Sequence, residues 1–230
     1  MYAPLPCVLQ LNKENAIEIE EATREQNACE RWHAERKKRL TASKFYELMK
    51  RKKITEKYIT SVLKPSTFTS APTSYGIASE SKAKKLYVER QGNHVHDIGL
   101  CINPAFPFLG ASPDGKVCDK GVCGILEVKC PYQARDMTIQ QAIESIPRFC
   151  LCMIGDSVKL EETHAYYYQI QGQLMITGAS FCDFVVFTRK DIFVQRIRPN
   201  TVFINDMLNS LCRIYFTYFH DKIHFENTEK

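Results

Sequence analysis

The spacing of apolar side chains divides the chain into a helical N-terminal part and a mixed remainder. Helical spacing prevails up to about residue 90, and alternating or short apolar runs take over after Gly92. The expected helices lie within residues 12–38, 44–49, 56–63, 75–90, 137–146, 166–177 and 202–219. The expected strands lie at residues 94–101, 116–118, 124–130, 184–187 and 193–197, the last two as a hairpin. This order predicts one α/β domain with a central mixed β-sheet flanked by helices.

Two local signals predict where helices begin and end. Thr41 and Ser43 place hydroxyl groups just before the amphipathic run 44–49, which is the pattern of a helix N-cap. Gly178 follows the expected helix 166–177, and we expect it to end that helix in the left-handed conformation that glycine adopts without steric cost.

Length and composition favour a single globular domain. With 230 residues, 44% of them apolar, the chain can bury one full core over residues 1–230, with a helical, basic part (1–65) and a catalytic core (75–220). No apolar run approaches ~18 residues, so we expect no membrane span. Residues 1–10 lack the basic region of a secretory signal, which predicts an intracellular protein, nuclear or cytoplasmic, with reduced cysteines.

The net charge of +5 is unevenly distributed. Residues 31–64 hold twelve lysines and arginines against three glutamates, a local balance of +9, so the remainder carries about −4. A concentrated basic segment favours a polyanionic partner, nucleic acid above all. A solvated helical face, or a nuclear-import stretch at residues 50–53, is the alternative interpretation.

Candidate chemistry gathers on the strand 124–130 and the turn before it. Asp114 leaves a turn, and Glu127 and Lys129 stand two apart on an apolar strand, so their side chains project from the same face. Two carboxylates and an ammonium on a buried face are costly unless they are paired or bind a cation. A hard divalent metal with oxygen ligands relieves that cost, which predicts a metal-dependent phosphodiesterase centre. An ordinary ion pair between Glu127 and Lys129 beside a turn aspartate is the alternative.

Five sequence blocks in order resemble the YqaJ-type viral recombinase family, which includes the phage lambda exonuclease and belongs to the PD-(D/E)xK nuclease superfamily. The resemblance runs from about residue 30 to about residue 190. The blocks are Trp32 with Arg36 and residues 40–43 (LTAS), 76–80 (GIASE), 109–115 (LGASPDG), 126–131 (LEVKCP) and 168–173 (YQIQGQ).

The resemblance implies a restriction-endonuclease-like core and a magnesium-dependent exonuclease that degrades linear double-stranded DNA from 5′-phosphorylated ends, leaving a single strand for recombination. One or two Mg²⁺ ions are expected, with Mn²⁺ as a substitute. A single-strand annealing recombinase is the expected partner. Relatives that form closed trimers and relatives that act as monomers are both compatible with this chain, and the family points to a viral or transposon-derived gene.

The family pattern also implies roles for individual residues. Asp114, Glu127 and the Val128 carbonyl would hold the metal, and Lys129 would sit beside the attacking water. Glu80 would reach a metal directly or through water. The alternative for Glu80 is a surface ion pair with Lys84 at i+4.

A glutamine of the helix 166–177 is expected in the active site. Gln169 and Gln173 share a helix face, whereas Gln171 lies about 160° away. By the family pattern Gln171 bonds the water or the scissile phosphate, with Gln169 as the runner-up. For the remaining glutamine, packing or solvent is expected.

Arg36 and Ser43 match the family positions that hold the 5′-terminal phosphate. A guanidinium binds phosphate oxygens bidentately, and a hydroxyl at a helix N-terminus adds a donor. Arg39 would replace Arg36 if the register differs. A solvated arginine and a simple capping serine are the alternatives.

Two rival functions share this fold: a catalytically silent DNA-end-binding protein and an endonuclease. Every catalytic residue type is present, which argues against the first. The Arg36 and Ser43 pair argues against the second, since an enzyme that cuts internally has no use for an end-phosphate site.

Overall fold

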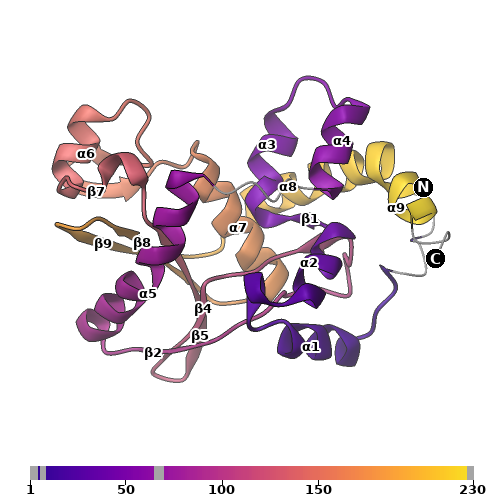
Figure 1. Cartoon of the computed structure of the whole chain (residues 1–230), viewed down its shortest axis with the longest axis horizontal. Helices are drawn as coiled ribbons and strands as arrows, with labels where there is room; N and C mark the ends of the chain where they lie inside the picture. The colour runs from indigo at the N-terminus through magenta and orange to yellow at the C-terminus, as the bar shows by residue number, and fades with distance from the viewer. Residues whose placement is uncertain (1–4, 6–8, 65–69, 227–230) are drawn as a thin grey trace.

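The computed structural model describes residue 5 and residues 9–64 and 70–226. It confirms the predicted α/β class, because a mixed β-sheet lies at the centre with helices on both faces (Figure 1). Residues 1–4, 6–8 and 65 of the predicted N-terminal part lie outside the described residues. Within the described ranges, no helix combines the length and the apolar character needed to cross a membrane.

The N-terminal part is helical, as predicted. Its helices are α1 (Lys13–Ala22), α2 (Glu30–Lys37), α3 (Phe45–Lys50) and α4 (Glu56–Leu63). The predicted hydroxyl cap before α3 is absent: a 3₁₀ turn at Ala42–Lys44 precedes the helix, and no side chain caps it. The turn follows the short strand β1 (Leu40–Thr41), which pairs in parallel with β3 (Leu109–Gly110).

Five strands form the central sheet in the order β2-β4-β5-β8-β9. They are β2 (His94–His96), β4 (Gly115–Asp119), β5 (Val122–Lys129), β8 (Cys182–Phe187) and β9 (Ile192–Ile197). β5 and β8 run parallel, and every other neighbouring pair in this sheet is antiparallel. A parallel pair needs a long crossover, and the chain between β5 and β8 supplies it.

Helices cover both faces of this sheet. The crossover contains α6 (Ile139–Ser145) and α7 (Ala165–Thr177), which pack on one face of the sheet. The helix α5 (Ala71–Gln91), which precedes the sheet in the chain, packs on the other face. Ile125 of β5 packs in the same cluster as Leu174 of α7, whereas Leu126 packs with Tyr87 of α5. The odd positions of β5 therefore face α7, and so do Glu127 and Lys129.

A second buried cluster contains side chains from the N-terminal helices and from the C-terminal helices. The helix α8 (Thr201–Ile214), a π-helical turn (Tyr215–Phe219) and α9 (His220–Glu226) form one run beside α3 and α4 (Figure 1). Phe45 and Leu48 of α3 belong to the same buried cluster as Met207 and Leu211 of α8. The sequence predicted this run as one helix, 202–219, and the structure extends it.

Two further differences from the sequence predictions concern short strands. The expected strand 94–101 stops at His96, and the sequence analysis missed a hairpin of β6 (Leu151–Ile154) and β7 (Ser157–Leu160). The hairpin turns at Gly155, whose φ is 58°. Gly178 ends α7 with a φ of 67°, which confirms the predicted left-handed cap.

Candidate active site

The register between β4 and β5 brings Asp114 beside Glu127. Gly115 is paired with Leu126, and the backbone N–H of Asp114 donates to the carbonyl of Leu126 at 2.9 Å. The Asp114 carboxylate then accepts a hydrogen bond from the N–H of Val128 at 2.6 Å. The two predicted acids, thirteen positions apart in the chain, therefore converge on one end of the sheet.

The Glu127 carboxylate is 2% exposed and is surrounded by donors. Its Oε1 lies 2.6 Å from Lys129 Nζ and accepts a hydrogen bond from Gln169 Nε2 at 2.5 Å. Its Oε2 accepts from Gln173 Nε2 at 2.6 Å. These contacts compensate the desolvation of a buried anion, which would otherwise be prohibitive.

The charges of the cluster act on one another. Burial, and after it the charge of Glu127, raises the pKa of the Asp114 carboxyl well above its usual value. Burial by itself lowers the pKa of Lys129, but Glu127 and Asp114 outweigh it and raise that pKa above its usual value. Lys129 is therefore a partly buried ammonium, with its side chain 21% exposed, and its Nζ lies 4.8 Å from the centre of the Tyr166 ring.

The donor set fits a magnesium-type cation. The described residues contain no group of three or more histidine, cysteine, aspartate or glutamate side chains arranged to hold a metal. Mg²⁺ keeps several waters and is usually held by only one or two carboxylates, which matches Asp114 and Glu127. Burial and the charge of Glu127 both raise the pKa of Asp114, and a divalent cation held between the two carboxylates would act in the opposite direction.

Glu80 forms the ion pair of the surface alternative, and its charge also acts on Asp114. It forms an ion pair with Lys84 at 2.6 Å, as the surface alternative predicted, and its side chain is 38% exposed. Its charge also contributes to the raised pKa of Asp114, so α5 brings it within electrostatic reach of the acids. A metal-binding role for Glu80 stays a prediction.

The structure distinguishes the glutamines of α7 by their contacts. Gln171 is buried on the other side of α7, where its Nε2 donates to the Arg198 carbonyl at 3.0 Å and its Oε1 accepts from the Asn200 N–H at 2.8 Å. The structure therefore places Gln171 away from Glu127, whereas the runner-up Gln169 contacts it. A role for either glutamine in the reaction stays a prediction. Gln173, for which packing was expected, also contacts Glu127.

Arg36 lies against the loop that leads to Asp114. Its guanidinium stacks on Trp32, 4.1 Å from the ring centre, and its Nη1 donates to the Ser112 hydroxyl at 3.4 Å. Ser112 also accepts from Trp32 Nε1 at 2.9 Å. Burial lowers the pKa of Arg36 to about 10, so this is a partly desolvated cation. Sequence analysis missed Ser112, although it stands next to Pro113 in the motif.

Arg39 is removed as a candidate for the same role. Its side chain is fully buried, with Nη1 2.6 Å from the Glu35 carboxylate and Nε donating to the Pro107 carbonyl at 3.0 Å. Ser43 is exposed, with its hydroxyl 3.4 Å from that of Thr41. Its 3₁₀ turn packs against α7, the helix that carries Gln169.

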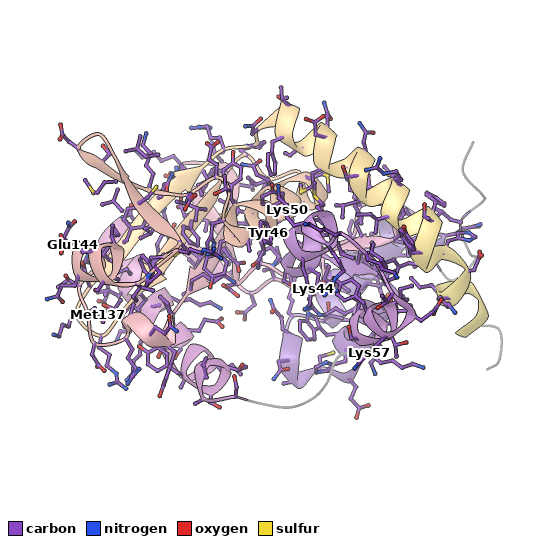
Figure 2. The ribbon with its side chains drawn as sticks, turned by 90° about the horizontal axis from the view of Figure 1, so that it is seen from above. Lys44, Tyr46, Lys50, Lys57, Met137 and Glu144 are labelled. Carbon is purple, nitrogen blue, oxygen red and sulfur yellow. The ribbon has the colours of Figure 1, made fainter. Side chains whose placement is uncertain are left out.

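The basic segment 31–64 is partly neutralised within the fold. Ion pairs with Glu18, Glu35 and Glu47 involve five of its twelve cations, namely Arg31, Lys38, Arg39, Lys44 and Arg51. Figure 2 shows Lys44, Lys50 and Lys57 on the side of the molecule formed by α3 and α4. Lys50 and Lys57 are exposed, so this side remains the candidate surface for a polyanion.

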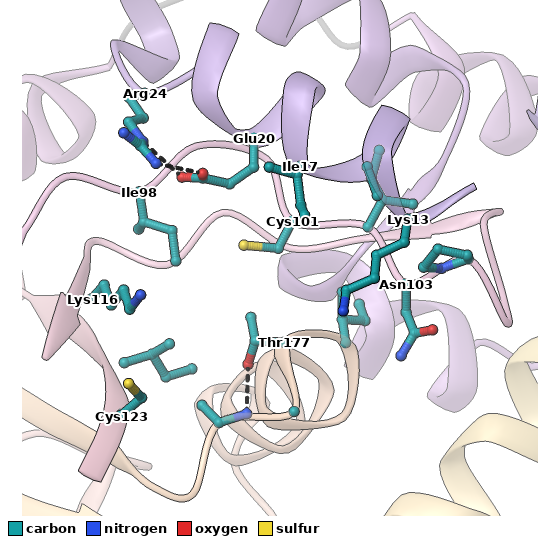
Figure 3. A pocket seen from close by; sticks show the side chains of 18 of the residues that line it. Lys13, Ile17, Glu20, Arg24, Ile98, Cys101, Asn103, Lys116, Cys123 and Thr177 are labelled. Atoms are coloured by element: carbon teal, nitrogen blue, oxygen red, sulfur yellow. Dashed lines mark hydrogen bonds and ion pairs between the residues drawn. The ribbon is translucent and has the colours of Figure 1, made fainter. Parts of the chain in front are cut away.

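A cavity of about 620 Å³ lies elsewhere, between α1 and the C-terminal end of α7. Figure 3 shows the Glu20–Arg24 ion pair at its wall and Thr177 across from it. Asp114, Glu127 and Lys129 do not line it. Its lining mixes apolar side chains with charges of both signs, so no ligand chemistry follows from it.

Comparison with protein families finds one match: the profile of the YqaJ-like viral recombinase domain matches residues 31–180, which include Arg36, Asp114, Glu127 and Gln169. No curated protein gives a significant match.

Solved structures show the same fold. The alkaline exonuclease LHK-Exo of Laribacter hongkongensis is 24% identical, with a TM-score of 0.65 over 87% of this chain and 97% of the other. A phage-related exonuclease from Haemophilus somnus is 16% identical, with a TM-score of 0.53 over 80% and 95%. A SOX–DNA complex is 12% identical, with a TM-score of 0.61 over 94% and 74%.

Proposed function

Because the chain belongs to the family of YqaJ-like viral recombinase domains, we propose that it is a magnesium-dependent exonuclease that degrades linear duplex DNA from 5′-phosphorylated ends. The observation that carries the proposal is the cluster of Asp114, Glu127 and Lys129 at the end of β5, in which Glu127 is buried and the other two are partly buried. A purely structural ion pair would need one carboxylate. The second, with its raised pKa, is a cost to the fold that a bound cation explains.

Asp114 and Glu127 would hold the cation, with the Val128 carbonyl as a third ligand and Glu80 nearby. When bound, such an ion would acidify a water and neutralise charge on the phosphate. Lys129 places a partly buried ammonium at the same site, where it would stabilise the charge that develops on the phosphate oxygens. Gln169 donates through Nε2 to Glu127 Oε1, and this contact would help to orient that carboxylate.

Arg36, Ser112 and Ser43 would select the DNA end. An enzyme that starts at a terminus needs an anion site at a fixed place relative to its reacting centre. Ser112 provides that link, since it contacts Arg36 and precedes Asp114 by two residues. The Trp32 ring holds the guanidinium plane, so its N–H groups are directed rather than free to rotate.

The test is incubation with linear duplex DNA carrying either a 5′-phosphate or a 5′-hydroxyl, in Mg²⁺ or in chelator. We expect mononucleotide release only with both Mg²⁺ and the phosphate, and Mn²⁺ should substitute. Cutting of closed circular DNA would instead support an endonuclease. Tight end binding without products would support a silent end-binding protein. No binding and no hydrolysis would reject all three.

Replacing Arg36 with alanine should remove the preference for phosphorylated ends. Charge-assisted bonds to phosphate contribute about 1.5–3 kcal/mol, so we expect the ratio of rates on 5′-phosphate and 5′-hydroxyl substrates to fall by about 10–100-fold. Lys37→Ala, an equal loss of charge at the next, exposed position, is the matched control and should keep the ratio. A ratio that survives in Arg36→Ala places the phosphate elsewhere.

The proposal extends to partners. A single strand left by digestion would pass to an annealing recombinase, and the chain would act as a trimer or a monomer. Sedimentation at assay concentration distinguishes the two states.

A further inference from the structure

Gln173 contacts the candidate metal site from inside the protein. It lies on α7 one turn after Gln169, is 1% exposed, and donates through Nε2 to Glu127 Oε2 at 2.6 Å. DNA and the attacking water arrive from solvent, so they cannot reach this side chain. Any part that Gln173 plays in the reaction must act through Glu127.

The other end of the same amide is unsatisfied. Gln173 Oε1 is buried and has no hydrogen-bond partner among the described residues. A buried acceptor without a partner costs about 1–3 kcal/mol, which an apolar side chain of the same length would avoid. The reverse orientation of the amide would set Oε1 against the Glu127 carboxylate. The bond to Glu127 therefore determines how this amide lies.

The two oxygens of Glu127 are used unequally. A carboxylate has about four lone-pair directions. Lys129 and Gln169 both approach Oε1, whereas Gln173 is the only described side chain that donates to Oε2. The direction still open to a further partner thus belongs to Oε2, the oxygen that Gln173 holds.

The packing of α7 fixes where this amide stands. A Cβ added at Gly172 would lie 2.5 Å from the Phe45 ring, so α7 and α3 touch at a place where only glycine fits. This contact sits next to Gln173 in the helix. The amide is therefore carried on a rigid support, as a group that positions a metal ligand requires.

We propose that Gln173 is a positioning residue for metal binding, which holds Oε2 of Glu127 where the divalent cation of the proposed function binds. The inference rests on that proposed function. Gln173 does not touch the metal or the substrate; it fixes the rotamer of the ligand and supplies one of its hydrogen bonds.

The experiment measures metal affinity without turnover, by calorimetric titration of Mn²⁺ into the full chain. Gln173→Met keeps the length and apolar packing of the side chain but cannot donate. Loss of an outer partner of a metal ligand typically weakens affinity by about 10–100-fold, and we expect that range here. In hydrolysis, high Mn²⁺ should restore most of the rate, and DNA binding in chelator should stay unchanged.

Gln171→Met is the matched control, because Gln171 is equally buried on the same helix but bonds the Arg198 and Asn200 backbone. It should lower the thermal unfolding midpoint and leave Mn²⁺ affinity unchanged. Equal Mn²⁺ affinity of Gln173→Met and the wild type overturns the inference, and so does an equal loss in both variants. If Gln173→Met does not fold, Gln173→Asn, whose amide falls one bond short, takes its place with the same outcomes. A wild type that binds no Mn²⁺ overturns the proposed function itself.

Discussion

Replacing Lys129 with alanine is expected to abolish measurable hydrolysis, with a loss of about 10²–10⁴-fold or more, while DNA-end binding changes little. Lys129 Nζ lies 2.6 Å from Glu127 Oε1, and both carboxylates raise its pKa, so it is a fixed positive charge at the reacting centre. The proposed end contacts come from Arg36, Ser43 and Ser112, on other elements. Binding therefore survives the substitution.

The same substitution gives a second readout. Removal of the ammonium leaves Glu127 and Asp114 with less compensation, so Mn²⁺ affinity should hold or increase even though turnover is lost. Single-turnover hydrolysis, end binding in chelator and Mn²⁺ calorimetry separate these effects. Lys116→Ala, on the exposed side of β4, is the control. If DNA binding falls in parallel with turnover, Lys129 belongs to the DNA contacts and its assigned role is wrong.

Replacing Glu127 with glutamine is expected to remove metal binding and hydrolysis together. Loss of a metal ligand should weaken metal affinity by more than the about 10–100-fold that is typical when a hydrogen-bond partner of a ligand is lost. The fold should survive, because the Gln173 side-chain amide can flip. Its unsatisfied Oε1 would then accept a hydrogen bond from the side-chain amide of the new glutamine. The variant thus removes a charge without removing the packing.

Calorimetry with Mn²⁺ and thermal unfolding measure the two halves of this prediction. Glu144→Gln, an exposed position on α6, repeats the charge change away from the site and should alter neither quantity. Retained Mn²⁺ affinity in Glu127→Gln would mean that the cation binds without this carboxylate. The centre would then have to be built around Asp114 and Glu80.

Local sequence patterns predicted most of the secondary structure, because each rests on contacts between near neighbours. The strand β5, the helix α7 and its glycine cap follow from alternation, helical spacing and the freedom of a residue without a Cβ. The β6–β7 hairpin was missed, since its strands are short and Met153 and Ile154 stay exposed at its end. The predicted N-cap at Thr41 does not form, because the pairing of β1 with β3 fixes the backbone of Thr41 in a strand.

The acids and the lysine of the site were predictable for a similar reason. Glu127 and Lys129 share a strand face by the period of two, and the family motif joins Asp114 to them. The family pattern favoured Gln171 over Gln169, because three glutamines alternate along one helix and the sequence does not show which face meets β5. Packing decided it: α7 lies on the sheet with Gln169 and Gln173 inward and Gln171 towards the chain after β9.

By itself, the sequence determined the class of fold and the family whose pattern the chain follows, and it named the acidic and basic residues proposed for the centre, because these depend on residue type and local spacing. Only the tertiary structure decided which side chains meet across long separations. In the structure, Arg39 forms a buried ion pair with Glu35. Ser112 accepts a hydrogen bond from Arg36, and Gln173 donates one to Glu127. Such contacts depend on how helices seat against the sheet, which the pattern along a single chain does not encode.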